Sequence, residues 1–255
     1  MNWLCALLLS LAAAFAHAQS RGLPAPPQTA FEQHLHAQLP LQLRLTDDDG
    51  KPVTLQQFFH QRPVVMVFGY YHCPNLCSTV MEGVLQTLAA LNLPTDDYAI
   101  VAVSIDPSET AAQAAAKKLI YRGMLDKADM HLLTGSADAT RALADTAGFQ
   151  YAYDAASGQY VHPSGFLIAT PDGVISRYFL GVRFDRDELR QALRQAASGR
   201  VGSLTDRLLL LCAHYDPTTG RYSIVVMNVI RMICIAVAVA LFAWIALRWK
   251  GRGWR

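Results

Sequence analysis

The stretch PVVMVFGYYHCPNLCSTVMEGV, from Pro63 to Val84, decides the fold because it joins a strand to a helix through two cysteines. Residues 63–70 are apolar and rich in β-branched side chains, which is typical of a fully buried strand. Between residues 78 and 92 apolar side chains recur at helical spacing, which predicts a helix. Cys73 and Cys77 therefore lie where the strand gives way to the helix.

The chain around this unit alternates between strand and helix patterns. Asp106, Pro107 and Glu109 match an N-cap, a first and a third helical residue, which predicts a capping box for a helix through Tyr121. This order is typical of an α/β, thioredoxin-like fold with a helical insertion between its halves, and it predicts one domain at 41–200. Further strands are expected at 41–45, 98–105, 130–134, 165–170 and 174–180, and further helices at 136–147, stopped by Gly148, and after Asp185 with its Glu188.

The first 40 residues have the pattern of a secretory leader followed by a linker. A short apolar run ends in the small-residue pattern Ala16, His17, Ala18, so we expect a signal peptide at 1–18 and a mature start at Gln19. The first residues carry no Lys or Arg, which leaves an uncleaved anchor as the alternative. The linker is expected at 19–40 and is proline-rich at 24–28.

The carboxyl-terminal part is apolar enough to predict one transmembrane helix at 224–247. Twenty-four residues at about 1.5 Å each span ~36 Å, which is enough for a tilted helix in a lipid bilayer. The tail at 248–255 is basic, so the positive-inside rule places it in the cytoplasm and the globular domain outside. We therefore expect a single-pass protein of a bacterial inner membrane, with its domain in the periplasm and a juxtamembrane segment at 201–223.

The charge balance argues against a nucleic-acid partner. The chain has 22 Lys and Arg against 20 Asp and Glu, and four of the cations lie in the tail, so the rest has a net charge of about −2 (18 − 20). No basic face is expected on the domain.

Cysteine usage points to chemistry and not to a disulfide scaffold. Of five cysteines, Cys5 belongs to the signal peptide and Cys234 to the membrane helix, which leaves Cys73, Cys77 and Cys212 in an oxidising compartment. If the helix begins near Pro74, as proline at a first helical position indicates, Cys73 lies at its amino end and Cys77 one turn further on the same face, where the helix dipole favours the thiolate. A thiolate is both a nucleophile for disulfide exchange and a soft ligand for copper(I), so the C-x-x-x-C spacing allows either use.

Three segments make the chain resemble the Sco/SenC family of copper chaperones that serve cytochrome c oxidase assembly. They are GYYHCPNLC, VSIDPSET and YVHPSGFLIATPDG, and the resemblance covers about residues 40–198. It implies a thioredoxin-like fold and a site for Cu(I) or Cu(II) made by Cys73, Cys77 and His162. It also implies as partners the copper-bearing subunit of cytochrome c oxidase, a thiol reductase and other copper carriers. The sequence departs from the family at Ser78, where proline is usual, and in placing its anchor at the carboxyl end.

Several alternatives stay open at this stage. A thiol-disulfide oxidoreductase without copper delivery would need Cys73 and Cys77 but not His162. A structural disulfide is a third interpretation, although a bridge over so short a loop adds little stability. His72 is expected to tune the site or lie at the surface, and Cys212 with His214 is expected on an amphipathic juxtamembrane helix without a metal.

Overall fold

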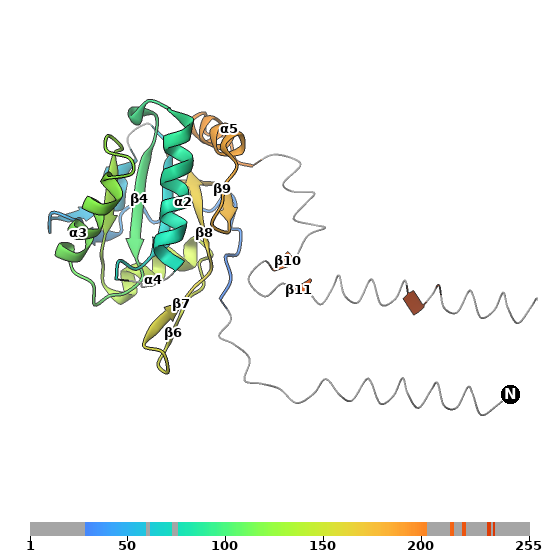
Figure 1. Cartoon of the computed structure of the whole chain (residues 1–255), viewed down its shortest axis with the longest axis horizontal. Helices are drawn as coiled ribbons and strands as arrows, with labels where there is room; N and C mark the ends of the chain where they lie inside the picture. Colours follow the sequence, from blue (N-terminus) through green and yellow to red (C-terminus); the bar gives the residue numbers. More distant parts are fainter. Residues whose placement is uncertain are drawn as a thin grey trace, which may run out of the picture.

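A computed structural model describes residues 29–59, 62–72 and 76–202, and isolated positions at 215–216, 221–222, 234–235 and 237. Its centre is a five-stranded sheet in the order β5-β4-β3-β8-β9 (Figure 1). The strands β3, β4 and β5 pair in parallel, β8 pairs antiparallel to β3, and β9 pairs antiparallel to β8. The strands are β3 Val64–Gly69, β4 Ala99–Ser104, β5 Met130–Leu133, β8 Gly165–Ala169 and β9 Ile175–Leu180.

The central strands are apolar on both faces because helices cover both sides of the sheet. Every residue of β4 is buried, and β3 is buried except at its last residue, Gly69. Val65 and Val67 face one core cluster, whereas Met66 and Phe68 face the other. A parallel strand between two helical layers reads as a continuous apolar run, so the strands expected at 63–70, 98–105 and 130–134 are confirmed.

Helices α2 Leu76–Leu91, α3 Ala111–Arg122 and α5 Arg186–Ala197 pack on one face of the sheet. In Figure 1, α2 lies between α3 on the left and α5 on the right. The opposite face is covered by α4 Ala137–Thr146, by the short helix η1 Leu55–Phe58 and by the amino-terminal segment. The helices expected at 78–92, at 136–147 and after Asp185 are confirmed, and Asp185 accepts a hydrogen bond from the Glu188 N–H as its cap.

Two local expectations are wrong. The strand expected at 41–45 is a turn followed by the shorter strand β1 Arg44–Thr46, which pairs with β2 Pro52–Thr54. The turn forms because the N–H of Leu43 donates to the carbonyl oxygen of Pro40 and Leu41 packs on the core.

The helix expected from Asp106 begins at Ala111 instead. Its N-cap is Thr110, and Gln113 completes the capping box. The capping box therefore lies four residues further along the chain than expected.

A hairpin made of β6 Ala152–Asp154 and β7 Gln159–Val161 projects from the domain (Figure 1). The arrow of β4 points toward the same end of the molecule. His162 follows the hairpin directly, before the chain enters β8. The hairpin therefore delivers His162 to the edge of the sheet at which the parallel strands end.

Little of the two chain ends is described. The signal peptide expected at 1–18, the first part of the linker at 19–28, and most of the membrane helix expected at 224–247 lie outside the described residues. Within the segment 201–223, β10 Tyr215–Asp216 pairs with β11 Arg221–Tyr222 in an antiparallel ladder, whereas Cys212 and His214, where the juxtamembrane helix is expected, lie outside the described residues. Within the described ranges, none of the helices combines the length and the apolar character that a membrane crossing needs.

Candidate functional site

The candidate site lies where β3 ends and α2 begins. Tyr70, Tyr71 and His72 follow β3, and Cys77 is the second residue of α2. The exposed N–H groups of a helix amino end stabilise anions, so this position suits a thiolate. Cys73 and the side chain of Cys77 lie outside the described residues, and their spacing of one helical turn stays a prediction.

His162 lies close to the segment that leads into Cys73. The Tyr70 ring contacts the His72 ring at 5.2 Å and the His162 ring at 6.1 Å, measured between ring centroids. Phe149 packs against His162 from another side at 5.7 Å. The fold thus brings together two of the segments that the sequence analysis assigned to one site, although they are far apart in the chain.

The state of the His162 ring suits a metal ligand. Its Nδ1 atom lies 2.8 Å from the carbonyl oxygen of Pro163, and a carbonyl can only accept, so Nδ1 carries the proton of the neutral ring. The lone pair is then on Nε2. Burial lowers the pKa of His162, which favours the neutral imidazole that binds metals.

The structure adds a residue that the sequence analysis had misassigned. Glu109 has a fully buried side chain, and its carboxylate accepts hydrogen bonds from the main-chain N–H groups of Tyr71 at 2.9 Å and His72 at 2.8 Å. The His72 Nδ1 atom donates to the same carboxylate at 2.5 Å, and so does the Ser104 hydroxyl at 2.5 Å. Glu109 is therefore bound to the residues before Cys73 and caps no helix.

Asp106, the other residue of the expected capping box, also has a different role. It accepts hydrogen bonds from the N–H and the hydroxyl group of Ser108, which closes a tight turn after β4. Its Oδ2 atom lies 3.7 Å from Nε2 of His72. One signal could have placed both acids near His72: they follow β4, His72 follows β3, and the carboxyl ends of neighbouring parallel strands meet at one edge.

Aromatic side chains surround the His162 side of the site. Tyr160 of β7 contacts Tyr70 at 5.8 Å, Tyr151 at 5.9 Å and Tyr153 at 5.1 Å between ring centroids. The Arg141 guanidinium lies 3.7 Å from the centre of the Tyr151 ring, which anchors the base of the hairpin to α4. The hairpin that carries His162 is thus fixed by ring contacts.

Ser78, the departure from the family pattern, has a partner in the structure. Lys117 of α3 donates a hydrogen bond from Nζ to the Ser78 hydroxyl at 2.7 Å. This contact joins the first turn of α2 to the neighbouring helix, beside Cys77.

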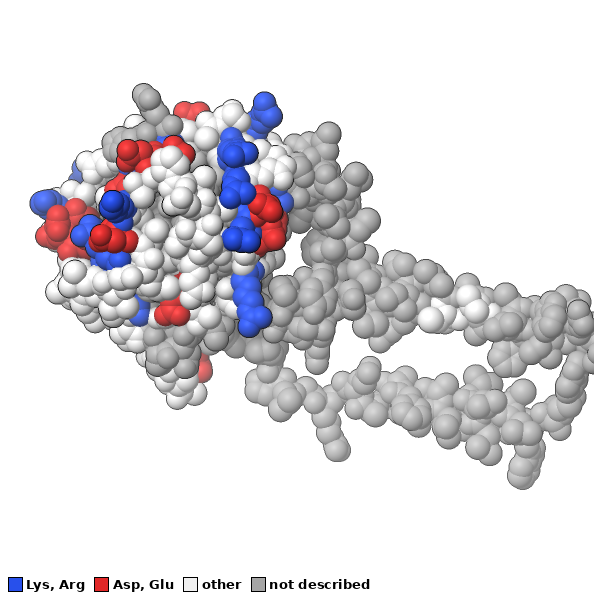
Figure 2. Space-filling model, turned by 45° about the horizontal axis from the view of Figure 1, so that its top comes forward, with Lys and Arg blue, Asp and Glu red and all other residues white. Residues whose placement is uncertain are grey.

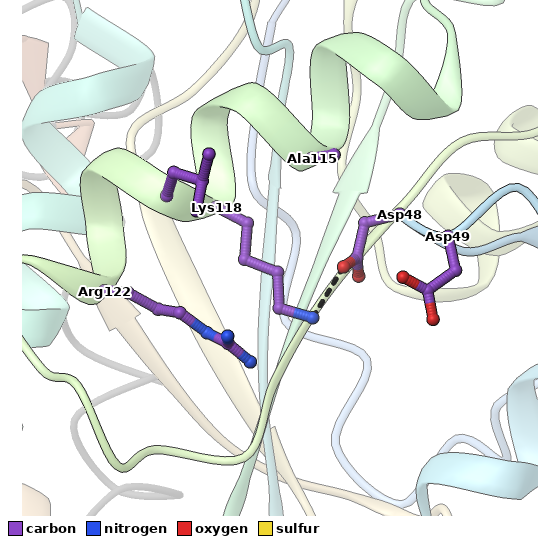
Figure 3. A pocket seen from close by; sticks show the side chains of 6 residues that line it. Asp48, Asp49, Ala115, Lys118 and Arg122 are labelled. Carbon is purple, nitrogen blue, oxygen red and sulfur yellow. Dashed lines mark hydrogen bonds and ion pairs between the residues drawn. The ribbon is translucent and has the colours of Figure 1, made fainter.

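A pocket of about 320 Å³ lies elsewhere, between α3 and the loop after β1. Figure 3 shows Lys118 and Asp48 paired across it, at 2.6 Å, with Asp49 and Arg122 nearby. Asp48 also accepts from the N–H of Leu132 in the edge strand β5. Two acids and two bases give the pocket no net charge, and none of its lining residues belongs to the candidate site.

Two negative findings apply to the described residues only. In that part of the chain, no group of three or more His, Cys, Asp or Glu side chains could hold a metal ion, and Cys73 lies outside it. Figure 2 shows both signs of charge on the visible face of the domain, mixed at the left and, at the right, as a row of Lys and Arg with Asp and Glu beside it. The mixture resembles an ordinary solvated surface and gives no support for a nucleic-acid interface.

The SCO1/SenC family model matches residues 32–198, well over half of the chain. This chain belongs to the SCO1/SenC family. Comparison with curated proteins gives no match.

Solved structures show the same fold at low sequence identity. A structure from Aquifex aeolicus VF5 is 22% identical with a TM-score of 0.58, over 65% of this chain and 95% of that one. A SCO1/SenC family lipoprotein from Bacillus anthracis is 19% identical with a TM-score of 0.54, over 69% and 99%. Copper-bound ScoI of Arabidopsis thaliana is 21% identical with a TM-score of 0.52, over 60% and 96%. The expected α/β, thioredoxin-like fold is confirmed for the domain.

Proposed function

We propose that this SCO1/SenC protein is a membrane-anchored copper carrier that binds copper through Cys73, Cys77 and His162. The observation that carries the proposal is the position of His162, next to the segment that leads into Cys73. Its Nδ1–H group donates a hydrogen bond to the carbonyl oxygen of Pro163, which leaves the lone pair of the neutral ring on Nε2. Two thiolates and an imidazole are the donor set that suits copper in either valence. The copper-bound state of ScoI from Arabidopsis thaliana supports the same cargo here.

The two thiols also determine when the site can be loaded. Oxidation of Cys73 and Cys77 to a disulfide releases two electrons and two protons and removes both sulfur ligands. In an oxidising compartment the pair must therefore be reduced by an external thiol reductase before copper binds. The membership in the family implies that the acceptor is the copper-bearing subunit of cytochrome c oxidase, and that other copper carriers supply the metal.

The location follows from the two chain ends. We place the domain of residues 41–200 in the periplasm, joined through 201–223 to a helix at 224–247 in the inner membrane and to a cytoplasmic tail at 248–255. Ile235 and Val237 have helical backbone and exposed side chains, which fits a helix that lies in lipid. The amino-terminal signal peptide at 1–18 leads the domain across the membrane.

The alternative function is a thiol-disulfide oxidoreductase without copper delivery, and His162→Ala separates the two. An imidazole nitrogen is needed to hold copper(II) beside two sulfurs, whereas two thiolates alone still hold copper(I). We expect copper(II) affinity to fall by more than about tenfold, with copper(I) affinity changed much less. Exchange with a model disulfide should persist, because both thiols remain.

His131→Ala is the matched control for this substitution. His131 is also a partly buried histidine, but it pairs with Asp129 and packs on Phe58. Copper binding by this control should equal that of the wild type. If His162→Ala binds copper(II) normally and supports oxidase assembly at the wild-type level, the oxidoreductase interpretation replaces copper delivery.

A further inference from the structure

Glu109 lies beneath the two residues that precede Cys73. It comes from the turn between β4 and α3, and its side chain reaches across to the end of the neighbouring strand β3. The carboxylate is fully buried, so it depends on protein donors in place of water. Helix capping does not explain why this acid is buried, because Thr110 and Gln113 cap the helix that follows.

All four donors converge on this one carboxylate. Oε1 accepts from the N–H and the Nδ1 atom of His72, and Oε2 accepts from the N–H of Tyr71 and the hydroxyl of Ser104. A carboxylate has about four acceptor sites, so the four donors match its capacity. Two of the donors are consecutive main-chain groups. Their bonds restrict the backbone of residues 71–72, and hence the direction in which the chain enters Cys73.

The same carboxylate orients the His72 ring. With Nδ1 bonded to Glu109, Nε2 faces Asp106 at 3.7 Å, and the Tyr70 ring lies against the imidazole. The ring is thus turned toward the acidic turn after β4. This arrangement gives His72 a structural partner and explains why it need not be a copper ligand.

We propose that Glu109 is a positioning residue for the Cys73–Cys77 pair, acting through the main chain of Tyr71 and His72. The proposal rests on the proposed function in so far as Cys73 is taken as the functional thiol. In this role Glu109 bonds to the main chain and is not itself a copper ligand. It holds the segment from which Cys73 extends, so that the first thiol is presented in one orientation to its partner sulfur, to copper and to an incoming disulfide.

Glu109→Gln tests this role with almost no change in size. An amide replaces one acceptor oxygen by an NH₂ group, which can only donate. Ser104 can rotate its hydroxyl to accept, and the His72 ring can accept at Nδ1 in its other neutral tautomer. The two main-chain N–H groups cannot adapt. Whichever way the amide lies, the N–H of Tyr71 or that of His72 loses its acceptor.

The readout is the chemistry of Cys73 in the reduced, metal-free full-length protein. We expect the alkylation rate of Cys73, resolved by peptide mass spectrometry, to change about tenfold in Glu109→Gln, because small displacements of a reacting group have large effects. The equilibrium constant of the Cys73–Cys77 disulfide with glutathione should change by a similar factor, which is about 30 mV for a two-electron couple. Glu109→Asp keeps both acceptor oxygens on a shorter side chain and should give an intermediate value.

Two controls separate positioning from loss of stability. Asp48→Asn makes the same exchange at a largely buried carboxylate of the pocket in Figure 3, which accepts hydrogen bonds from Lys118 of α3 and from the N–H of Leu132 in β5. Ser104→Ala removes a donor from Glu109 but leaves both main-chain bonds. Both variants are expected to lose stability and to keep the wild-type reactivity of Cys73. If either control changes Cys73 as much as Glu109→Gln does, the effect is one of general stability and the proposal is wrong.

The outcome is distinguishable from failure of the proposed function. If the wild type binds no copper but Glu109→Gln still changes the alkylation rate of Cys73, Glu109 is a positioning residue and the copper-delivery proposal is wrong. If the wild type binds copper and Glu109→Gln leaves the rate and the equilibrium constant unchanged, the positioning proposal is wrong and copper delivery is retained. Should Glu109→Gln fail to fold, Glu109→Asp gives the decision by the same two measurements.

Discussion

Tyr178 joins three separate parts of the chain through one side chain. Its hydroxyl donates to the carbonyl oxygen of Ala147 at 3.0 Å and accepts from the N–H of His34 at 3.0 Å. Its ring lies edge-on against Phe31 at 5.0 Å between centroids. The amino-terminal segment and the end of α4 are therefore held on β9 by one phenol, which must stay protonated to donate.

The pH dependence of stability reports on this phenol. Burial raises the pKa of Tyr178 to about 12, above the value of about 10 in an unfolded chain. A pKa that is raised by folding gives stability that is complete below pH 10 and is lost as the pH rises from 10 to 12. We expect the free energy of unfolding of the wild type to fall by about 2 kcal/mol more than that of Tyr178→Phe over this range, measured by denaturant titration. Parallel pH profiles for the two proteins would contradict the assignment.

Single residues differ in how far sequence patterns predict them. Cys73 and Cys77 stand out because their spacing and their place after a strand are local features. His162 could be assigned only through the family resemblance, since its approach to Tyr70 depends on the hairpin β6–β7 and on strand order. Glu109 was misassigned because its main-chain partners follow the neighbouring strand β3, far away in the sequence, whereas a capping pattern compares only residues three apart.

The helix α3 shows the same limit for whole elements. The sequence predicted the helix and its carboxyl-terminal half, but placed its start at Asp106 instead of Thr110. Both starts satisfy a local rule. The helix starts after Thr110 because the carboxylate of Glu109 is hydrogen-bonded to the N–H of Tyr71 and that of Asp106 accepts from Ser108 in a turn. Existence and order of elements follow from apolar periodicity, whereas helix ends depend on tertiary contacts.

The cap of α3 gives a test at the scale of the element. The Thr110 hydroxyl accepts a hydrogen bond from the N–H of Gln113, and the side-chain oxygen of Gln113 accepts one from the N–H of Thr110. Thr110→Ala should lower the free energy of unfolding by about 1 kcal/mol, as loss of an N-cap usually does. Thr110→Ser keeps the hydroxyl and should remain close to the wild type in thermal and denaturant unfolding. Equal losses in the two variants would show that the hydroxyl does not cap the helix.

The whole molecule combines a weakly acidic domain with a basic carboxyl-terminal tail. Without its four tail cations the chain has a net charge of about −2 (18 − 20), although the complete chain has +2. Of the proposed site residues, His162 and the backbone of Cys77 lie in the described domain. In the proposed topology these tail cations are the signal that sets the orientation, because Lys and Arg beside a membrane helix stay in the cytoplasm.

Reporter fusions test this arrangement on the full chain. A reporter that is active only in the cytoplasm should work after Arg255 and fail after Ser198, where the domain ends. A reporter that needs disulfides should show the opposite pattern, because disulfides form outside the cytoplasm. Replacing Arg248, Lys250, Arg252 and Arg255 by Ala should weaken the orientation and reduce the difference between the two fusion sites. Cytoplasmic activity at both sites would place Cys73 and Cys77 in a reducing compartment, where the pair would need no external reductase before loading copper.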